Sequence, residues 1–319
     1  MHEFQIINKY FLKLSNTNKN SLNLNDDVFF DKSRNLVVSM DTYIEGIHFI
    51  NFKKPELVIK KIIRSSISDI ICKGVKPKYY FVSGSGNKKS FSSSNLKKIS
   101  KSLQQEQNKF GILLCGGDTV YSNKLSFTIT SIGFSQKIIP RNNAKLNDDI
   151  YITGNLGDSF AGLNILKKKI NVNNSLIRYF ENKYYLPNLH LELCNRLLIF
   201  ANTSMDVSDG LITDLEKLIN KQKLSYKLNL DSIPISKNLN KLLTQKKLDK
   251  ISFVSQGDDY QILFTANPSK SRIINKTAKS LGVKISKIGK ICSNQQKSQI
   301  IDKKGNKITI KDKGYSHQF

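Results

Sequence analysis

The apolar positions in the first half of the chain alternate between strand-like runs and helix-like spacing. The β-branched run at 36–40 predicts a strand that ends at Asp41. From Pro55, a residue suited to the first turn of a helix, isoleucines recur at helical spacing until Gly74 ends the pattern. Asp69 is expected on this helix, away from its apolar stripe. The other elements expected in this half are a strand at 79–82 that leads into a polar loop at 83–94, a helix around 96–103, a buried strand at 112–115 and an amphipathic strand at 126–133.

The second half follows a polar, basic stretch near residues 140–149, where we place a domain boundary. Its expected elements are strands at 150–154, 226–230, 251–254 and 261–265, helices at 160–168, 187–200, 211–218 and 269–281, and a closing strand pair. Antiparallel-looking alternation mixed with helices predicts an α+β fold rather than a doubly wound parallel sheet. A chain of 319 residues also exceeds what one hydrophobic core usually supports. We therefore expect two domains, 1–140 and 141–319.

The composition is strongly basic, with 51 Lys and Arg against 25 Asp and Glu and a formal net charge of +26. Such a charge is compatible with nucleic-acid binding. The lysines are spread along the whole chain, however, and the sequence has no RNP-like aromatic motif, zinc finger or arginine-rich tract. We therefore favour a generally solvated basic surface and expect no specific nucleic acid as a partner.

The sequence also indicates in which cellular compartment the protein is found. No stretch approaches the about 20 apolar residues that span a bilayer, and the first residues lack the basic and apolar regions of a secretory signal. The four cysteines lie far apart, without metal-ligand spacing, and three of them are in contexts typical of reduced, buried thiols. We therefore expect a cytoplasmic protein that does not associate with a membrane.

The few acidic residues gather in short clusters beside Gly, Ser and Thr at the ends of apolar runs. The clusters are Asn25-Asp26-Asp27, Ser39-Met40-Asp41-Thr42, Ser68-Asp69, Gly116-Gly117-Asp118-Thr119, Asp206-Val207-Ser208-Asp209-Gly210 and Gly257-Asp258-Asp259-Tyr260. Any one of them alone could be ordinary turn chemistry. Together they indicate carboxylates collected around a hard cation such as Mg²⁺, which binds oxygen ligands and usually works beside a substrate phosphate. The sequence therefore predicts a Mg²⁺-dependent enzyme that acts on phosphates.

Common nucleotide-binding and hydrolytic motifs are missing from the sequence. It has no Walker loop and no His-Arg-Asp or Asp-Phe-Gly of a protein kinase, and Gly84-Ser85-Gly86 lacks the third glycine of a dinucleotide fingerprint. Four widely separated histidines argue against a zinc hydrolase. A phosphoryl-transfer enzyme of this composition would depend on several magnesium ions rather than on a glycine-rich cradle.

The ordered acidic clusters, with the stretch 41–49 and the ending Gly314-Tyr315-Ser316-His317, resemble the motif series of the thiamine-monophosphate kinase family. This family belongs to the aminoimidazole-ribonucleotide-synthetase-like superfamily, and the resemblance covers nearly the whole chain. It implies ATP-dependent phosphorylation of thiamine monophosphate to thiamine diphosphate with Mg²⁺. It also implies an N-terminal mixed sheet that binds ATP and magnesium and forms a homodimer, and a C-terminal α/β sandwich that completes the active site.

The resemblance also assigns roles to individual residues. The positions that match magnesium ligands are Asp27, Asp41, Asp69, Asp118, Asp206 and Asp209, with Ser39 as an additional oxygen ligand and Met40 at a position where the family commonly has Thr. The positions that match ATP contacts are Gly117, Asp118, Arg141 and Ser208. The positions that match contacts to the thiamine substrate are His48, Asp258 and Tyr315. No residue is assigned as a general base, because the acceptor phosphate is already largely ionised near neutral pH.

The chain departs from the family pattern at a few of these positions. Asn25 replaces the usual Gly, and Asn tolerates the left-handed conformation. Met40 removes a hydroxyl but leaves a backbone carbonyl, and Asp258 is one methylene shorter than the usual Glu. The ending His317-Gln318-Phe319 carries one extra residue. These departures leave the magnesium ligands intact and affect the substrate contacts.

Other functions remain open at this stage. Within the superfamily, the alternatives are aminoimidazole ribonucleotide synthetase, selenophosphate synthetase and the hydrogenase-maturation dehydratase. Cys72 lies too far along the chain for the N-terminal reactive residue of a selenophosphate synthetase, and Phe319 stands where the dehydratase has a functional cysteine. An alternative from another class is a basic nucleic-acid-binding protein, which would show salt-sensitive binding to DNA or RNA.

Overall fold

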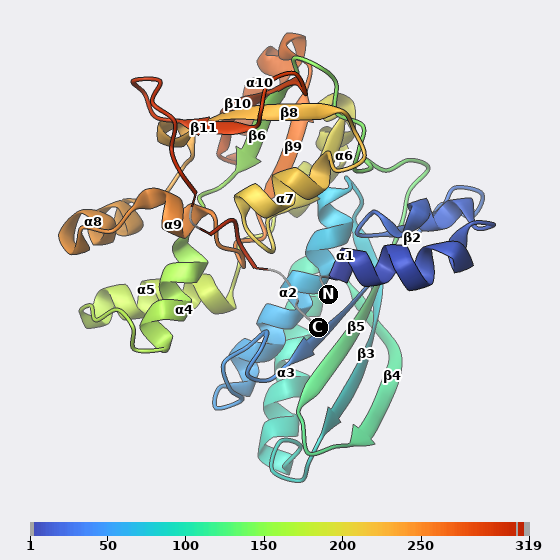
Figure 1. The fold of residues 1–319 in the computed structure, drawn as a ribbon. Coiled ribbons are helices and arrows are strands. Elements are labelled where there is room, and N and C mark those ends of the chain that lie inside the picture. Colours follow the sequence, from blue (N-terminus) through green and yellow to red (C-terminus); the bar gives the residue numbers. More distant parts are fainter. Residues whose placement is uncertain (1–2, 311, 316–319) are drawn as a thin grey trace.

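Two β-sheets, each built from one half of the chain, organise the fold (Figure 1). The structure, a computed structural model, describes residues 3–310 and 312–315. The first sheet has the strand order β1-β2-β5-β3-β4, and the second has the order β11-β8-β10-β6-β9-β7. Both sheets contain antiparallel pairs and one parallel pair, β3 with β4 and β11 with β8. The predicted α+β fold with a mixed N-terminal sheet is therefore confirmed.

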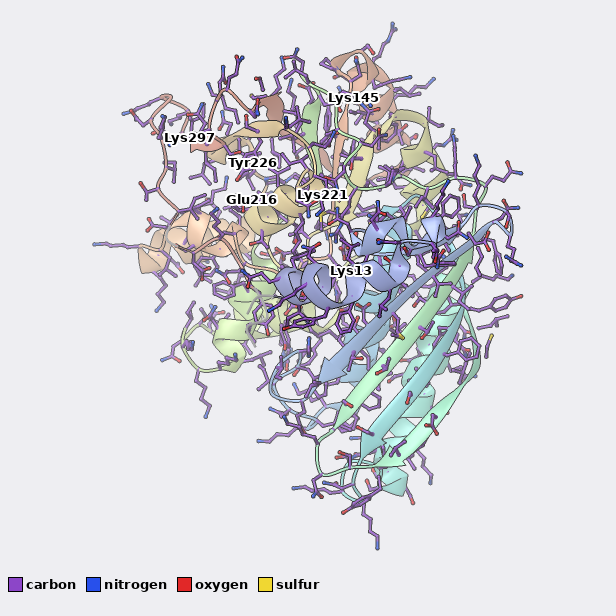
Figure 2. The ribbon with its side chains drawn as sticks, turned by 45° about the vertical axis from the view of Figure 1, so that its right-hand side comes forward. Lys13, Lys145, Glu216, Lys221, Tyr226 and Lys297 are labelled. Atoms are coloured by element: carbon purple, nitrogen blue, oxygen red, sulfur yellow. The ribbon has the colours of Figure 1, made fainter. Side chains whose placement is uncertain are left out.

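The first half has helices on one face of its sheet only (Figure 1). Its elements are β1 (Phe29–Asp31), β2 (Leu36–Ile44), α2 (Pro55–Cys72), β3 (Pro77–Gly86), α3 (Ser93–Phe110), β4 (Leu113–Tyr121) and β5 (Ser126–Phe134). Before them come α1 (Glu3–Ile6) and three short helical segments, Ile7–Phe11, Leu12–Ser15 and Lys19–Leu24. Helices α2 and α3 cover one face, and Figure 2 shows the strands of the other face without a helix over them in the described part of the chain.

Helix α2 lies between the two sheets and joins their cores. It begins with Pro55 in its first turn and ends before Gly74, whose φ of +79° suits the left-handed position after a helix. Its isoleucines pack in one hydrophobic cluster with Tyr184 and with Phe264 of the second half. Because α2 contacts β2 and β5 on one side and β7 and α5 on the other, it is buried almost all round. The predicted boundaries of α2 are confirmed, but Asp69 faces the interior between the two halves rather than solvent.

The second half places its sheet above α2 and adds several helices (Figure 1). Its strands are β6 (Asp149–Thr153), β7 (Thr203–Asp206), β8 (Leu224–Asn229), β9 (Ile262–Ala266), β10 (Ile285–Ser293) and β11 (Gln299–Ile301). Its helices are α4 (Asp158–Leu166), α5 (Asn174–Tyr185), α6 (Cys194–Phe200), α7 (Leu211–Leu218), α8 (Lys237–Lys246), α9 (Lys250–Val254) and α10 (Ser271–Leu281). Three 3-10 turns complete this half among the described residues, namely Leu191–Leu193, Leu230–Ser232 and Pro268–Lys270.

Several predicted elements differ from the structure. Strand β2 continues past Asp41 to Ile44, because every residue from 36 to 44 pairs with β5. Strand β3 likewise extends to Gly86, inside the predicted polar loop. The run at 112–115 was expected to be buried, but only Ile112 is, whereas β4, an edge strand, is exposed along its whole length. A strand cannot show from its own sequence which of its faces is covered.

The remaining differences lie in the second half. Residues 250–254 form helix α9 and not a strand, since a short apolar run fits either structure. The helix expected at 187–200 is confined to a 3-10 turn and α6. The last two strands do not pair with each other, because β8 lies between them. Helices α5 and α8 have no counterpart among the predicted elements.

Two further expectations can be compared with the structure. Only Cys72 and Cys194 are buried, whereas Cys115 is exposed and Cys292 is partly exposed, so fewer thiols are enclosed than the sequence suggested. No helix among residues 3–310 and 312–315 has the length and apolar character needed to cross a bilayer. Ser316 and His317 of the ending motif, and the extra residue beyond them, lie outside the described residues.

Candidate functional site

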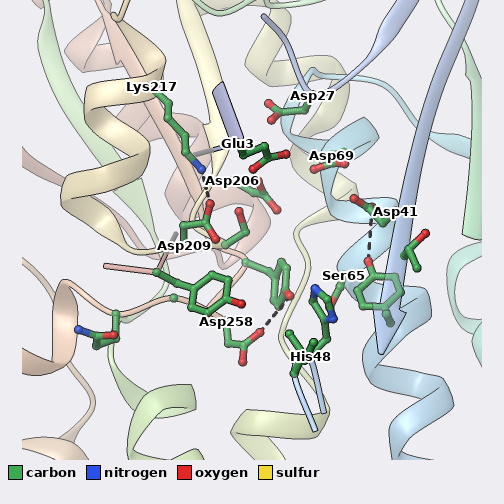
Figure 3. Close-up of a pocket in the computed structure, with 18 of the residues that line it drawn as sticks. Glu3, Asp27, Asp41, His48, Ser65, Asp69, Asp206, Asp209, Lys217 and Asp258 are labelled. Carbon is green, nitrogen blue, oxygen red and sulfur yellow. Dashed lines mark hydrogen bonds and ion pairs between the residues drawn. The ribbon is translucent and has the colours of Figure 1, made fainter. Parts of the chain in front are cut away.

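A pocket of about 590 Å³ is lined by residues from both halves of the chain (Figure 3). The N-terminal helical segment, β2 and α2 form one side, and the segments after β7 and around residue 258 form the other. Asp27, Asp41, Asp69 and Asp206 crowd one end of this pocket, and His48 and Asp258 lie toward the opposite end, where several aromatic residues also line it (Figure 3). The pocket is therefore suited to a ligand with a charged part and a flat, less polar part.

Three carboxylates from three different elements meet at the charged end (Figure 3). Asp41 comes from β2, Asp69 from α2 and Asp206 from the end of β7. Because residues alternate between the faces of a strand, Ser39 and Asp41 both point to the side of the sheet that α2 covers. The Ser39 hydroxyl donates to Asp69 Oδ2 at 2.6 Å, and the Ser68 hydroxyl donates to Asp206 Oδ2. These bonds orient Asp69 and Asp206, whereas Asp41 has, among the described residues, only the Tyr43 hydroxyl, at 3.4 Å from its Oδ2.

These carboxylates are destabilised in their charged forms. Burial, and next the charge of Asp206, raises the pKa of Asp41 to about 7. Burial, and next the charges of Asp41 and Asp206, raises the pKa of Asp69 well above its usual range. Burial also raises the pKa of Asp206. Like charges held together away from water favour either protons or a cation between them.

Metal-free protein is expected to lose stability as the pH rises from about 4 to about 7. An unfolded aspartate releases its proton near a pKa of about 3.9, whereas Asp41 in the folded protein holds its proton up to about 7. Between these values the folded state binds the extra proton, so raising the pH lowers the free energy of unfolding. Thermal unfolding in chelator at several pH values measures this slope, and Asp41→Asn should flatten it. A midpoint that rises over the same range would contradict the expectation.

Asp27 is held by two basic side chains. Lys73, which is fully buried, places Nζ 2.7 Å from Asp26 Oδ1 and 2.8 Å from Asp27 Oδ2, and donates to the Ser204 carbonyl at 2.8 Å. Arg141 donates through Nε to Asp27 Oδ2 at 3.1 Å and through its terminal nitrogen to Oδ1. Sequence reasoning identified Arg141 but missed Lys73, because nothing marks one lysine as buried in a chain with so many.

Asp209 has a similar basic neighbour. Lys217, in the last turn of α7, forms an ion pair with Asp209 and lies 3.4 Å from Asp214 Oδ1. Asp214 in turn accepts the backbone N–H groups of Asp209 and Gly210 at 2.9 and 3.0 Å. Lys217 lines the pocket and was not identified from the sequence. Its position eight residues after Asp209, two turns along the chain, was the available signal.

The pocket carboxylates offer the oxygen atoms that Mg²⁺ prefers, but those that the structure describes do not form a complete coordination shell. Among the described residues, no group of three His, Cys, Asp or Glu side chains is arranged to hold one ion. Mg²⁺, however, keeps several waters and is usually held by one or two carboxylates together with substrate phosphates. Asp41 and Asp69, partly buried with raised pKa values and few hydrogen-bond donors, supply such hard oxygen ligands. The site fits ions that enter with a phosphate ligand.

Two glycines bring the loops of the second half into backbone contact beside the pocket. A Cβ at Gly257 would lie 1.8 Å from the Ser208 carbonyl oxygen, and one at Gly210 would lie 1.8 Å from that of Ser255. Any side chain there would push the loops apart. The close approach lets Asp258 N donate to the Ser208 carbonyl at 2.8 Å. Ser208, Asp209 and Asp258 are thereby placed on one wall of the pocket.

The other end of the pocket is aromatic. Its main side chains are Phe160, Tyr184, Tyr260, Tyr315 and His48. His48 accepts the Ile44 backbone N–H at Nδ1, at 3.0 Å, which leaves the ring proton on Nε2. The Tyr315 backbone N–H donates to the Asp209 carbonyl at 2.9 Å, so the described end of the chain is attached to the pocket wall. The predicted substrate residues are thus grouped at one end of the pocket.

Most predicted site residues line this one pocket. They are Asp27, Met40, Asp41, His48, Asp69, Arg141, Asp206, Ser208, Asp209, Asp258 and Tyr315. Ser39 lies directly behind, against Asp69. The side chain of Met40 points to the opposite face of β2 from Asp41, so only its backbone could offer oxygen to the carboxylate cluster. Gly117 and Asp118 do not line the pocket of this chain, because they lie on β4 at the far edge of the sheet.

The chain is similar to known proteins in sequence and in fold. Residues 25–135 match the family model for AIR synthase related protein, N-terminal domain. Thiamine-monophosphate kinase of Buchnera aphidicola subsp. Schizaphis graminum (strain Sg) is 34% identical over 326 residues, which cover 99% of this chain and 98% of the relative. Thiamine-monophosphate kinase of Haemophilus influenzae is 30% identical over 327 residues, which cover 99% and 98% of the two chains.

Solved structures resemble the fold. AaThiL complexed with AMPPCP and TMP has a TM-score of 0.85 at 23% identity and covers 99% of this chain and 97% of its own. E. coli HypE, a hydrogenase maturation protein, has a TM-score of 0.68 at 16% identity, with 86% and 84% of the two chains covered. At these identities the likeness establishes a shared fold.

Proposed function

The chain belongs to the thiamine-monophosphate kinase family, and we infer that it catalyses ATP-dependent phosphorylation of thiamine monophosphate to thiamine diphosphate. This inference depends on the pocket, which has carboxylates at one end and aromatic side chains at the other. Buried carboxylates and Arg141 suit the phosphates of two anionic reactants, while aromatic side chains and Asp258 suit a flat heteroaromatic ring system. Thiamine monophosphate combines these two features in one molecule.

We propose that the carboxylate end holds several Mg²⁺ ions. The residues that would hold them are Asp27, Asp41, Asp69, Asp206 and Asp209, with Ser39 and the backbone of Met40 as further oxygen donors. When bound, the ions would neutralise the repulsion between the two phosphate groups. Lys73 already supplies one fixed positive charge at Asp27. This arrangement needs no general base, since the acceptor phosphate is ionised.

The remaining pocket residues would position the reactants. Arg141, whose planar guanidinium binds phosphate in a bidentate manner, would hold ATP together with Ser208. His48 would contact the thiamine substrate, with its Nε2 proton as the donor. Tyr315 would contact the heteroaromatic rings, and its aromatic face suits a cationic thiazolium. We propose direct in-line transfer between the two phosphates, without a phosphoenzyme.

We also propose that the active site is completed in a homodimer. Asp118 lies three strands away from β2, about 14 Å in a sheet with the usual strand spacing. Asp41 pairs with Ile129 of β5, Ile129 pairs with Val82 of β3, and Val82 pairs with Gly117 of β4. Paired residues point to the same face of a sheet, and successive residues of a strand point to opposite faces. Asp118, which follows Gly117, therefore points to the face opposite to that of Asp41. It cannot reach the carboxylates of its own chain, whereas a second copy packed on the open face could supply it.

The open face has the character of a surface that another subunit covers. Its strands expose large apolar side chains, namely Met40, Phe81, Leu113, Val120 and Phe134. Exposed apolar patches of this kind mark protein interfaces. The division into an N-terminal part, 1–140, that binds ATP and dimerises and a C-terminal part, 141–319, that completes the site is part of this proposal. The cytoplasmic location and the lack of a nucleic-acid partner stay predictions.

An assay of the purified protein with ATP, Mg²⁺ and thiamine monophosphate tests the function. We expect thiamine diphosphate and ADP in equal amounts, and no turnover with aminoimidazole precursors or selenide in place of thiamine monophosphate. Turnover of either replacement, or salt-sensitive binding to DNA or RNA without kinase activity, would point to one of the alternatives.

Direct transfer has its own test. Incubation with ATP carrying a labelled γ-phosphate should leave no label covalently attached to the protein after denaturation, because no nucleophile with an activating base is needed. Recovery of labelled protein that transfers its label to thiamine monophosphate would contradict direct transfer.

A further inference from the structure

The aromatic end of the pocket rests on a lysine that solvent does not reach. Lys61 of α2 is 1% exposed, and its Nζ lies 2.9 Å from Asp258 Oδ1 and 3.1 Å from the Tyr184 carbonyl oxygen. The ammonium also stands over the Tyr184 ring, 4.1 Å from its centroid. A buried ammonium without partners is strongly unfavourable, so Lys61 is committed to these contacts in the folded protein.

Asp258 is aimed into the pocket by its backbone and by two donors. Its φ of +70° is uncommon for a residue other than glycine and is kept by the loop contact to Ser208. Oδ1 receives Lys61 and the Tyr260 hydroxyl, the latter at 3.0 Å (Figure 3). Within the described part of the chain, no hydrogen bond or ion pair uses Oδ2, and the side chain is 28% exposed. Oδ2 is therefore the atom that Asp258 presents to a ligand.

The ion pair with Lys61 weakens the electrostatic attraction between Asp258 and a cationic ligand. A cation about 4 Å from the carboxylate would lie about 7 Å from the ammonium behind it, and by Coulomb's law the pair attracts it less than half as strongly as a lone carboxylate. A hydrogen bond to Oδ2 does not suffer in this way, because it depends on the direct contact of donor and acceptor. The geometry thus favours a short-range, directional contact over charge attraction.

We propose that Lys61 is a positioning residue that makes Asp258 a hydrogen-bond acceptor for an exocyclic amino group on a heteroaromatic ring. This inference rests on the proposed function and deepens it. Thiamine monophosphate carries both an amino group, on its pyrimidine ring, and a positive charge, on its thiazolium ring. Asp258 recognises the amino group, and the rings of Tyr184 and Tyr260 contribute the flat surface beside it.

Two substrate analogues distinguish recognition of the amino group from attraction of the cationic ring in the wild-type protein. The first replaces the pyrimidine amino group by a keto oxygen, and the second replaces the thiazolium by a neutral thiophene. We expect the keto analogue to lower kcat/KM by about 100-fold or more, as in sites built to pair a substrate donor. The neutral-ring analogue should lower it by less than about tenfold. The reverse order would overturn the proposal.

Variants of Asp258 and Lys61 test the role of each residue. In Asp258→Asn, the amide oxygen can still accept from Lys61, and the amide N–H group takes the place of Oδ2 in the pocket. This variant should therefore have a higher kcat/KM for the keto analogue than for thiamine monophosphate. Lys61→Met should raise KM for thiamine monophosphate by about tenfold while KM for ATP and kcat change less than about twofold. Lys61→Met should also reduce the ratio of kcat/KM for thiamine monophosphate to kcat/KM for the keto analogue. Retention of the wild-type preference in both variants would overturn the proposal.

Lys60→Met is the matched control, one residue earlier on the same helix. Lys60 forms no ion pair or hydrogen bond among the described residues, so its replacement should leave both KM values and the preference unchanged. Calorimetric binding of thiamine monophosphate and the two analogues separates this inference from the proposed function. Binding with the expected preference but without turnover would overturn only the function, whereas binding without that preference would overturn only the role of Lys61. No binding at all would overturn both.

Discussion

Asp41→Asn is expected to lower kcat by about 1,000-fold or more while making the metal-free protein more stable. The activity should fall because Asp41 is a ligand in the proposed magnesium cluster, where charge neutralisation between two phosphates contributes several kcal/mol. The stability should rise because burial and Asp206 already raise the pKa of Asp41 to about 7, so its charge is unfavourable in the fold. We expect an increase in Tm of about 2–4 °C in chelator at pH 8, and a similar pattern for Asp69→Asn.

Asp31→Asn is a suitable control on the neighbouring strand. Hydrogen bonds from Ser33 and Arg34 lower the pKa of Asp31 to about 2, so its charge is favourable in the folded protein. Its replacement should therefore reduce stability and leave the rate unchanged, the opposite of Asp41→Asn in both respects. Thermal unfolding and steady-state kinetics of the three variants measure this. If Asp41→Asn lowered the Tm as much as Asp31→Asn, the Asp41 carboxylate would be structural.

The parts of this fold that local sequence determines could be predicted. Helix α2 has Pro55 at its start, an isoleucine repeat and Gly74 at its end, and each of these acts within a few residues. The burial of β4 could not be predicted in the same way. Its apolar run is like that of a core strand, and only the strand order makes it an edge with an uncovered face.

The candidate site shows the same division. The order of the acidic motifs identified most of the pocket carboxylates, because a motif reports residue type and local backbone shape. Lys61 and Lys73 were missed, since their burial arises from contacts with Tyr184 and Ser204, more than a hundred residues along the chain. The face that Asp118 occupies also escaped prediction, as it depends on the register of three strand pairs.

Mixing two inactive variants is expected to restore activity if the partner subunit's Asp118 completes the site. Asp118→Asn and Asp41→Asn homodimers should each be nearly inactive, because every active site lacks one ligand. In a mixed dimer, one site carries both substitutions and the other carries neither. Statistical reassociation of closed two-fold dimers should therefore recover about a quarter of the wild-type activity.

The control for this experiment uses two substitutions that the structure places in the same chain. Asp41→Asn and Asp69→Asn affect carboxylates that share one pocket, so their mixed dimer still has a defect in each site and should recover no activity. Recovery with the Asp118 variant and none with the Asp69 variant would place Asp118 in the neighbouring subunit's site. If neither mixture regained activity while subunit exchange was shown by mass, Asp118 would have to act within its own chain. That result would require β4 to move across the sheet, since in this fold its side chain faces away from Asp41.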